Sequence, residues 1–208
     1  MNATQTLRNE HRVIEAVLTC LERIADELDS TRELDTYAAG QALEFLGTFA
    51  DRCHHGKEEQ LLFEHLESCG MPRDDGPTGV MRHEHDLGRK LMATMRQAVD
   101  NFHRQPVASA AQFLYAAREY IDLLRRHIQK EDHCLFPLAD KLLGADERQD
   151  LESSFAKFES SHEMHAAHER CLAIAKHLTR RYGIEMDHAA VVSHGCCSGP
   201  FVTAPCGE

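Results

Sequence analysis

The sequence contains no tryptophan, few other aromatic residues and no long apolar run, and each absence excludes a class of protein. Aromatic residues make up 6% of the 208 residues, and there are only 6 prolines. This composition lacks the aromatic and β-branched bias of a β-sandwich or barrel. No stretch approaches the roughly 18 consecutive apolar residues that predict a membrane-spanning helix. The composition therefore favours a mostly helical, soluble protein.

Basic residues are scarce relative to acidic ones. The chain has 23 Lys and Arg against 34 Asp and Glu, a formal net charge of −11 at pH 7. Such a field repels the phosphates of nucleic acids and anionic lipids, so we expect neither nucleic acid nor a membrane as a partner. The first residues show no basic segment followed by an apolar one, and the eight cysteines are spread in the manner of reduced thiols. We therefore expect a cytoplasmic protein.

Apolar residues recur every three or four positions along five segments, which predicts five amphipathic helices. They cover about residues 4–28, 34–68, 77–102, 107–143 and 146–181. Pro137 lies inside the fourth segment and is expected to kink or restart that helix.

Four long helices joined by short polar loops pack most simply as an up-down-up-down bundle. The predicted fold class is therefore all-α, with three parts. Residues 1–145 form the four-helix bundle, residues 146–183 an additional C-terminal helix, and residues 184–208 an irregular, flexible tail that contains cysteine.

Histidine is the residue in excess, and it recurs four positions before glutamate. A His and a Glu at this spacing share one helix face, with Cβ atoms about 6 Å apart, and can bind one metal centre together. With 15 His and 20 Glu in the chain, chance predicts roughly 1.4 such pairs. The sequence holds five: His11/Glu15, His54/Glu58, His55/Glu59, His127/Glu131 and His165/Glu169.

Position relative to the apolar stripe distinguishes these pairs. His54 and Glu58 continue the apolar stripe of their helix and are expected to point into the core. His55 and Glu59 continue a polar face, and we expect them to point outward or to lie behind the ligands.

The other bundle helices offer further inward-facing histidines. His127 and Glu131 continue an apolar stripe, and His11 occupies an apolar heptad position. The third helix offers His83 or His85, of which His85 lies in line with apolar residues. Four His and two Glu from four helices describe a dinuclear non-haem iron or manganese site, since two carboxylates can bridge two cations and leave positions open for a small ligand.

Four segments, in this order, resemble the hemerythrin-like (HHE cation-binding) family. They are Asn9-Glu10-His11-Arg12, His54-His55-Gly56-Lys57-Glu58-Glu59-Gln60-Leu61-Leu62-Phe63, Glu84-His85-Asp86, and His127-Ile128-Gln129-Lys130-Glu131 with Leu135-Phe136-Pro137. The resemblance spans about residues 4–143. It implies a four-helix bundle that holds two iron ions with an oxo or hydroxo bridge, manganese being the alternative metal. The implied ligands are His11, His54, Glu58, His85, His127 and Glu131.

The ligand pattern departs from that of oxygen-carrying hemerythrins, which have a second histidine on the third helix. Met81 and Arg89 stand four residues before and after His85, and Glu131 is the simplest last-helix carboxylate, with Asp132 in reserve. This set is similar to that of family members that resemble iron–sulfur cluster repair proteins.

The resemblance therefore implies a centre that binds or reacts with dioxygen, nitric oxide or peroxide, in iron handling or iron–sulfur cluster repair. An iron–sulfur protein would then be a partner. The alternative is a non-catalytic oxygen or nitric oxide binding or sensing protein. Whether the protein is an enzyme and what its oligomeric state is stay open at this point.

Residues outside the four motifs offer weaker candidates. His162, His165 and Glu169 share a face of the fifth helix and indicate either a second metal site or, as we favour, the polar side of a helix packed on the bundle. Cys134, one turn from Glu131, is expected to be a small core residue. The tail thiols bind a soft metal, cycle between thiol and disulfide, or are merely tolerated there; they are Cys196, Cys197 and Cys206.

Overall fold

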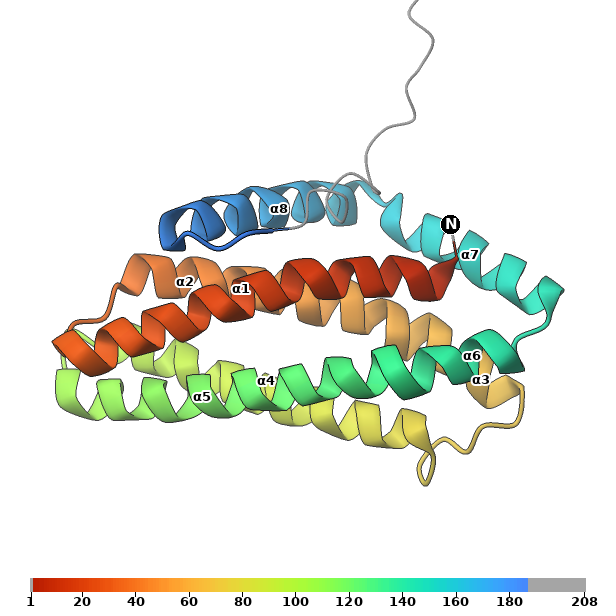
Figure 1. Cartoon of the computed structure of the whole chain (residues 1–208), viewed down its shortest axis with the longest axis horizontal. Helices are drawn as coiled ribbons and strands as arrows, with labels where there is room; N and C mark the ends of the chain where they lie inside the picture. The colour runs from red at the N-terminus through yellow and green to blue at the C-terminus, as the bar shows by residue number, and fades with distance from the viewer. Residues whose placement is uncertain (1, 187–208) are drawn as a thin grey trace, which may run out of the picture.

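The computed structural model describes residues 2–186, apart from the side chains of residues 162 and 163, and every regular element in this part is a helix. Four long helices run alternately up and down and form the bundle, and two further helices lie along one side (Figure 1). The first and third bundle helices are α1 (Ala3–Thr31) and α4 (Pro77–Asn101). The expected all-α bundle is thereby confirmed.

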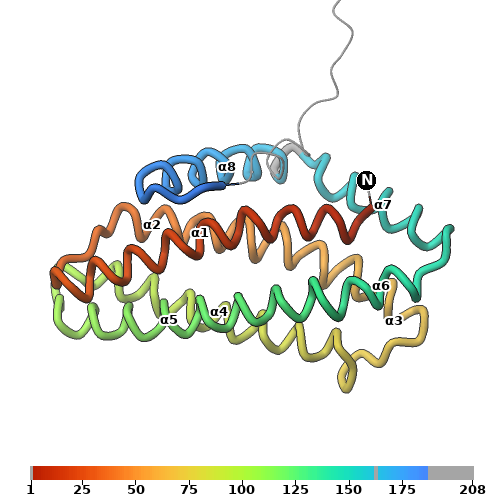
Figure 2. Tube along the Cα trace, in the orientation of Figure 1, coloured from red at the N-terminus to blue at the C-terminus, as the bar shows by residue number. Residues whose placement is uncertain are grey.

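The bundle helices begin and end where the local sequence favours it. The side chain of Asn2 accepts a hydrogen bond from the Thr4 backbone N–H and caps α1. Both α4 and α5 (Pro106–Lys130) begin with a proline, whose missing N–H costs nothing in the first turn of a helix. The turns between helices stay short, which keeps sequence neighbours antiparallel (Figure 2).

The second and fourth bundle helices contain π-helical turns. α2 (Thr36–Phe45) continues through η1 (Leu46–His55) and η2 (Glu58–Leu62) into α3 (Phe63–Ser68). α5 continues through η3 (Glu131–Leu135) into α6 (Phe136–Leu142). Pro137 lies in the first turn of α6, which agrees with the prediction that it restarts the helix. Each π turn closes an i→i+5 hydrogen bond, and one extra residue rotates the register downstream by about 100°.

This rotation makes the prediction for Cys134 wrong. At ordinary helical spacing Cys134 would share the inner face of Glu131, but its side chain is exposed. The inner face after Glu131 belongs instead to Leu135 and Phe136, which are buried. The extra residue in η3 therefore turns the thiol away from the core.

The segment predicted as one C-terminal helix consists of two. α7 (Ala145–Glu159) and α8 (His162–Tyr182) are separated at residues 160–161, where Ser161 caps α8 by accepting a hydrogen bond from the Met164 N–H. α7 packs against α1 and η2, whereas α8 packs against α1, α2 and η1. The break lets the two apolar stripes face different parts of the bundle.

The buried apolar residues form two separate clusters. One is centred on α1, α2, α4 and α5 and includes Cys171 and Leu178 of α8. The other joins the N-terminal turn of α1 to α3 and α6 and includes Leu151 and Phe155 of α7. A layer of buried polar side chains separates the two clusters, and the break between α7 and α8 lets each helix complete one of them.

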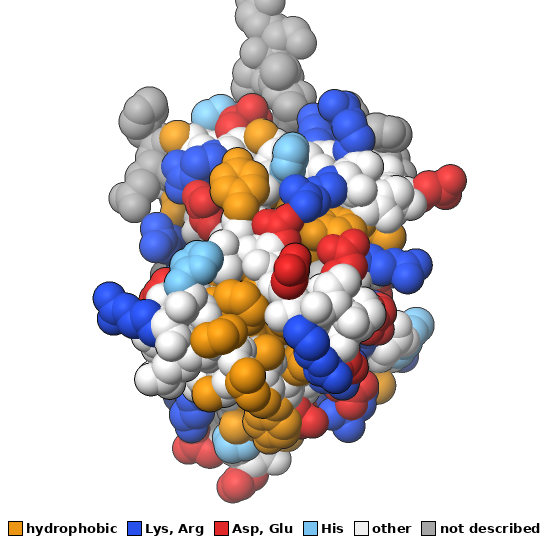
Figure 3. All heavy atoms as spheres, turned by 90° about the vertical axis from the view of Figure 1, so that its left-hand side faces the viewer, with side chains coloured by type: hydrophobic (Ala, Val, Ile, Leu, Met, Phe, Trp, Pro, Cys, Tyr) orange, Lys and Arg blue, Asp and Glu red, His pale blue; other side chains and the backbone are white. Residues whose placement is uncertain are grey.

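The surface at one end of the bundle carries apolar side chains among charges of both signs (Figure 3). Tyr37 and Val107, in the first turns of α2 and α5, are 66% and 84% exposed. No helix within the described residues has the length and apolar character needed to cross a bilayer.

Candidate metal centre

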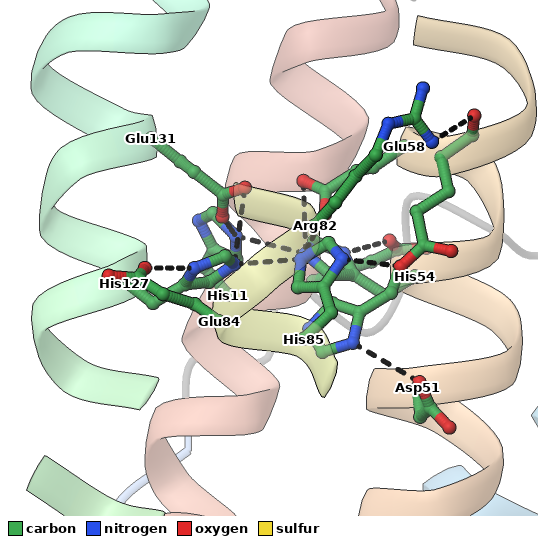
Figure 4. Close-up of polar contacts among 12 residues, drawn as sticks. His11, Asp51, His54, Glu58, Arg82, Glu84, His85, His127 and Glu131 are labelled. Carbon is green, nitrogen blue, oxygen red and sulfur yellow. Dashed lines mark hydrogen bonds and ion pairs between the residues drawn. The ribbon is translucent and has the colours of Figure 1, made fainter. Parts of the chain in front are cut away.

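The six residues expected to be metal ligands lie together in the polar layer between the two core clusters. Each is at most 2% exposed. Their side chains project toward one another from four bundle helices (Figure 4). They are His11 of α1, His54 of η1, Glu58 of η2, His85 of α4, His127 of α5 and Glu131 of η3.

The four imidazoles form two pairs. The Nε2 atoms of His11 and His54 are 3.0 Å apart, and those of His85 and His127 are also 3.0 Å apart. Each pair joins two neighbouring helices of the bundle, α1 with η1 and α4 with α5, so the two pairs together lie at two of the four helix interfaces.

The two carboxylates span both imidazole pairs. Glu58 has one oxygen 3.5 Å from His54 Nε2 and the other 3.5 Å from His85 Nε2. Glu131 likewise has its oxygens 3.3 Å from His11 Nε2 and 3.3 Å from His127 Nε2. This is the arrangement by which two carboxylates can each bridge a pair of cations.

None of these four carboxylate oxygens has a hydrogen-bond partner, although both residues are fully buried. Buried polar atoms are nearly always hydrogen-bonded, and buried charges are paired or bind metal. Two groups of possible ligands, each with its ligand atoms within 4.8 Å of one another, share Glu58: His11, His54, Glu58 and Glu131, and His55, Glu58, His85 and His127. The donor set therefore fits two cations of the iron or manganese type.

Each imidazole is oriented by an acidic residue behind it. A carboxylate can only accept a hydrogen bond, so the Nδ1 atom of each ring carries a hydrogen, and in the neutral ring Nε2 then presents its lone pair to the centre. The Nδ1 to oxygen distances are 2.8 Å for His11 with Asp132, 2.8 Å for His54 with Glu10, 2.6 Å for His85 with Glu59 and 2.9 Å for His127 with Glu84.

A cation pairs with each of these four acids and balances its charge. The pairs are Arg12 with Asp132, Lys57 with Glu10, Arg89 with Glu59 and Lys130 with Glu84. The His and Glu spacing does not indicate this role for Glu10 and Glu84, and it offers Asp132 only as a reserve ligand. A usable signal exists, because these two glutamates directly precede His11 and His85, while Glu59 and Asp132 directly follow Glu58 and Glu131.

The two carboxylates differ strongly in pKa in the metal-free chain. Burial, followed by the charge of Glu131, raises the pKa of Glu58 well above its usual value. Burial alone would also raise the pKa of Glu131, but the charges of the His127 and His11 imidazoles, each 3.3 Å from one of its oxygens, hold it well below the usual value. Burial alone would lower the pKa of His127, but the nearby Glu131 raises it to about 9. Cations at the centre would displace these protons.

His55 does not point outward, contrary to the first of the two orientations expected for it. It is 5% exposed, because η1 adds a residue to the turn and rotates His55 toward the interior. Its ring stacks on that of His85, with centroids 3.8 Å apart and planes inclined by 14°. Nitrogen lone pairs lie in the ring plane, so two parallel stacked rings do not converge on one cation. His55 therefore covers His85, which matches the alternative that it lies behind the ligands.

A small cavity of about 10 Å³ adjoins the His85 and His127 side of the centre. His55 and Tyr120 line it, and a Cβ atom at Gly88 would lie 3.4 Å from the Tyr120 ring. Such a volume holds about one water-sized molecule.

The other candidates lie apart from this centre. His83 is exposed on α4, as are His165 and Glu169 on α8. The side chain of His162 lies outside the described residues. So do the tail cysteines, Cys196, Cys197 and Cys206.

Comparison with known proteins gives a consistent picture. Residues 2–139 match the Hemerythrin HHE cation binding domain. An uncharacterized protein of Mycobacterium bovis is 26% identical over 163 residues, which cover 74% of this chain and 60% of that protein. The iron-sulfur cluster repair protein YtfE of Edwardsiella ictaluri is 33% identical over 124 residues, which cover 58% of this chain and 48% of that protein. The YtfE protein of Salmonella paratyphi B is 33% identical over 138 residues, which cover 64% of this chain and 60% of that protein.

The chain thus spans about half to three fifths of the length of these relatives. No solved structure is significantly similar to it. The family match covers well over half of the sequence and contains all four helices that meet at the buried His and Glu side chains. The chain therefore belongs to the hemerythrin HHE cation-binding family.

Proposed function

We propose that the protein is a non-haem di-iron protein whose centre binds or reacts with a small ligand, namely dioxygen, nitric oxide or peroxide, in iron handling or iron–sulfur cluster repair. The observation that carries this proposal is the set of four buried carboxylate oxygens without hydrogen-bond partners, placed between four imidazole Nε2 atoms. When bound, the two iron ions would supply electrons and open coordination positions; manganese is the alternative metal.

The chain's own residues bind, orient and shield this centre. Glu58 and Glu131 offset the charge of two cations, while the Nδ1 hydrogen bonds keep the four rings in place. Phe136 stacks on His11 with ring centroids 5.5 Å apart and excludes water from that side. The cavity beside His127 has room only for a molecule of very few atoms, which supports a diatomic ligand or peroxide.

The relatives named as iron-sulfur cluster repair proteins support the assignment to iron handling or repair. An iron–sulfur protein would then be the macromolecular partner. We further infer that the protein acts in the cytoplasm, where thiols such as the five free cysteines of the described chain stay reduced.

Anaerobic reconstitution with ferrous iron, followed by metal analysis and by optical and Mössbauer spectra, tests the proposal. We expect about two iron ions per chain and spectral changes when oxygen, nitric oxide or peroxide is added. Repeated turnover would favour an enzyme, and stoichiometric reversible binding would favour the alternative, a carrier or sensor. His85→Ala should lose iron, whereas His83→Ala, two residues away on the exposed face of the same helix, should not. A wild-type chain that retains no iron would refute the proposal.

A further inference from the structure

Lys57 differs from the three other cations that pair with the acids behind the imidazoles. The side chains of Arg12, Arg89 and Lys130 are 43%, 37% and 41% exposed, so water also solvates their charges. The side chain of Lys57 is 2% exposed. A buried ammonium group requires nearby negative charge and several hydrogen bonds, because desolvation is costly.

Lys57 obtains a second carboxylate from outside the bundle. Its Nζ donates a hydrogen bond to Glu10 of α1 and another, 2.6 Å long, to Glu159 at the end of α7. Glu10 accepts the Nδ1 hydrogen of His54 through its other oxygen. A continuous row of charged contacts therefore leads from Glu159 through Lys57 and Glu10 to a candidate metal ligand.

The end of α7 is closely fitted to the segment that carries Lys57. The Lys57 ammonium lies 5.6 Å from the centroid of the Phe155 ring. Gly56 directly precedes Lys57, and a Cβ atom at Gly56 would lie 3.2 Å from the ring of Phe158. The absence of a side chain at Gly56 therefore lets α7 approach η1 and η2 closely. Phe158 and Glu159 also line a cavity of about 50 Å³ that lies beside Lys57.

We propose that α7, which lies beyond the residues matched by the family, is part of the metal centre: Glu159 is a positioning residue that fixes Lys57 and, through Glu10, the imidazole of His54. The C-terminal helices would then set how tightly the ion beside His11 and His54 is held. This inference rests on the proposed function, since it concerns the same two ions. Groups that orient a metal-binding histidine typically change metal affinity 10- to 100-fold when they are removed.

The test compares the release of iron from Glu159→Gln with that from the wild type. Glu159 is 37% exposed and ends its helix, so the variant should fold normally. We expect one of the two iron ions to pass to a chelator roughly 3- to 10-fold faster, since Glu159 acts one step behind the hydrogen-bonded acid. Mössbauer and optical spectra should change for that ion alone. Glu159→Asp keeps a carboxylate and should therefore release iron at a rate between those of Glu159→Gln and the wild type. Glu152→Gln, on the same helix, should behave as the wild type.

A double-mutant cycle tests whether Glu159 acts through Lys57. Lys57→Met should accelerate release more than Glu159→Gln does, and Glu159→Gln should add nothing when Lys57 is already Met. Unchanged release and spectra in Glu159→Gln, or effects of the two substitutions that simply add, would overturn the inference while the di-iron proposal stands. A wild-type protein without iron would instead overturn both. If Lys57→Met fails to fold, the comparison of Gln, Asp and wild type at position 159 still decides the matter.

Discussion

Replacing Glu58 by glutamine should stabilise the metal-free protein while it removes iron from the metal-bound one. The Glu58 carboxyl group is 0% exposed, has no hydrogen-bond partner for either oxygen and faces Glu131 across the centre. Such a carboxyl group stabilises the folded chain when cations are bound to it and destabilises the folded chain when they are absent. The same substitution should therefore have opposite effects on the two states.

The size of the effect on the metal-free state depends on pH. Burial and the charge of Glu131 raise the pKa of Glu58 above its usual 4.5, so the folded chain binds a proton that the unfolded chain has lost. The contribution of Glu58 to the stability of the wild type must then fall as pH rises from 4.5 toward the raised pKa, by about 1.4 kcal/mol per pH unit. Glutamine does not titrate, so the advantage of Glu58→Gln should be small near pH 4.5 and grow at that rate.

Urea denaturation of chelator-treated protein at several pH values from 4.5 to 8 measures this difference, with metal analysis of parallel, reconstituted samples. We expect the variant to hold fewer than two iron ions, because it loses a carboxylate that spans both positions. Glu64→Gln, on the exposed face of α3, is the matched control and should leave both measurements unchanged. A metal-free variant that is less stable at every pH, or a difference that does not vary with pH, would refute the reasoning.

Three further predictions follow from the same geometry. His127→Ala should reduce the iron content to one ion or fewer, whereas His55→Phe should keep both ions, because its ring covers a ligand without converging on the cation; metal analysis distinguishes them. Iron binding below pH 9 should release protons, since the pKa of His127 is raised to about 9, and calorimetry in two buffers of different ionisation enthalpy would show this. Cys134 should react with iodoacetamide in the native protein, whereas Cys171, whose pKa burial raises to about 12, should react only after unfolding, as peptide mass spectrometry would reveal.

The sequence was sufficient to predict the helices of the bundle and the six clustered side chains, because both follow from the spacing of residues along single helices. It was insufficient at the π turns. An extra residue in one turn leaves no compositional signal, yet it rotates everything that follows. The outward orientation, one of the two expected for His55, and the buried position expected for Cys134 were therefore both wrong. Both failures lie within π turns that also carry candidate ligands.

The break between α7 and α8 was missed for a different reason. Two serines are compatible with a continuous helix, so the local sequence does not require a break at residues 160–161. The break is favoured by tertiary packing, since Phe155 joins one apolar cluster and Leu178 the other. These clusters are distinct only because the polar centre separates them, which a sequence pattern for one helix does not reveal.

The acids behind the imidazoles show why a centre of this kind is a property of the whole bundle. Each helix orients the histidine of a neighbour: α1 holds that of η1, η3 holds that of α1, α4 holds that of α5, and η2 holds that of α4. The contacts close a ring around the bundle. A shift of any one helix would therefore misalign one histidine directly and loosen the next. The residue spacing along one helix indicates the candidate ligands but not the acids that orient them, because each acid orients a histidine on another helix. Glu159 of α7 adds a further helix to this arrangement, since it binds the lysine that pairs with one of these acids.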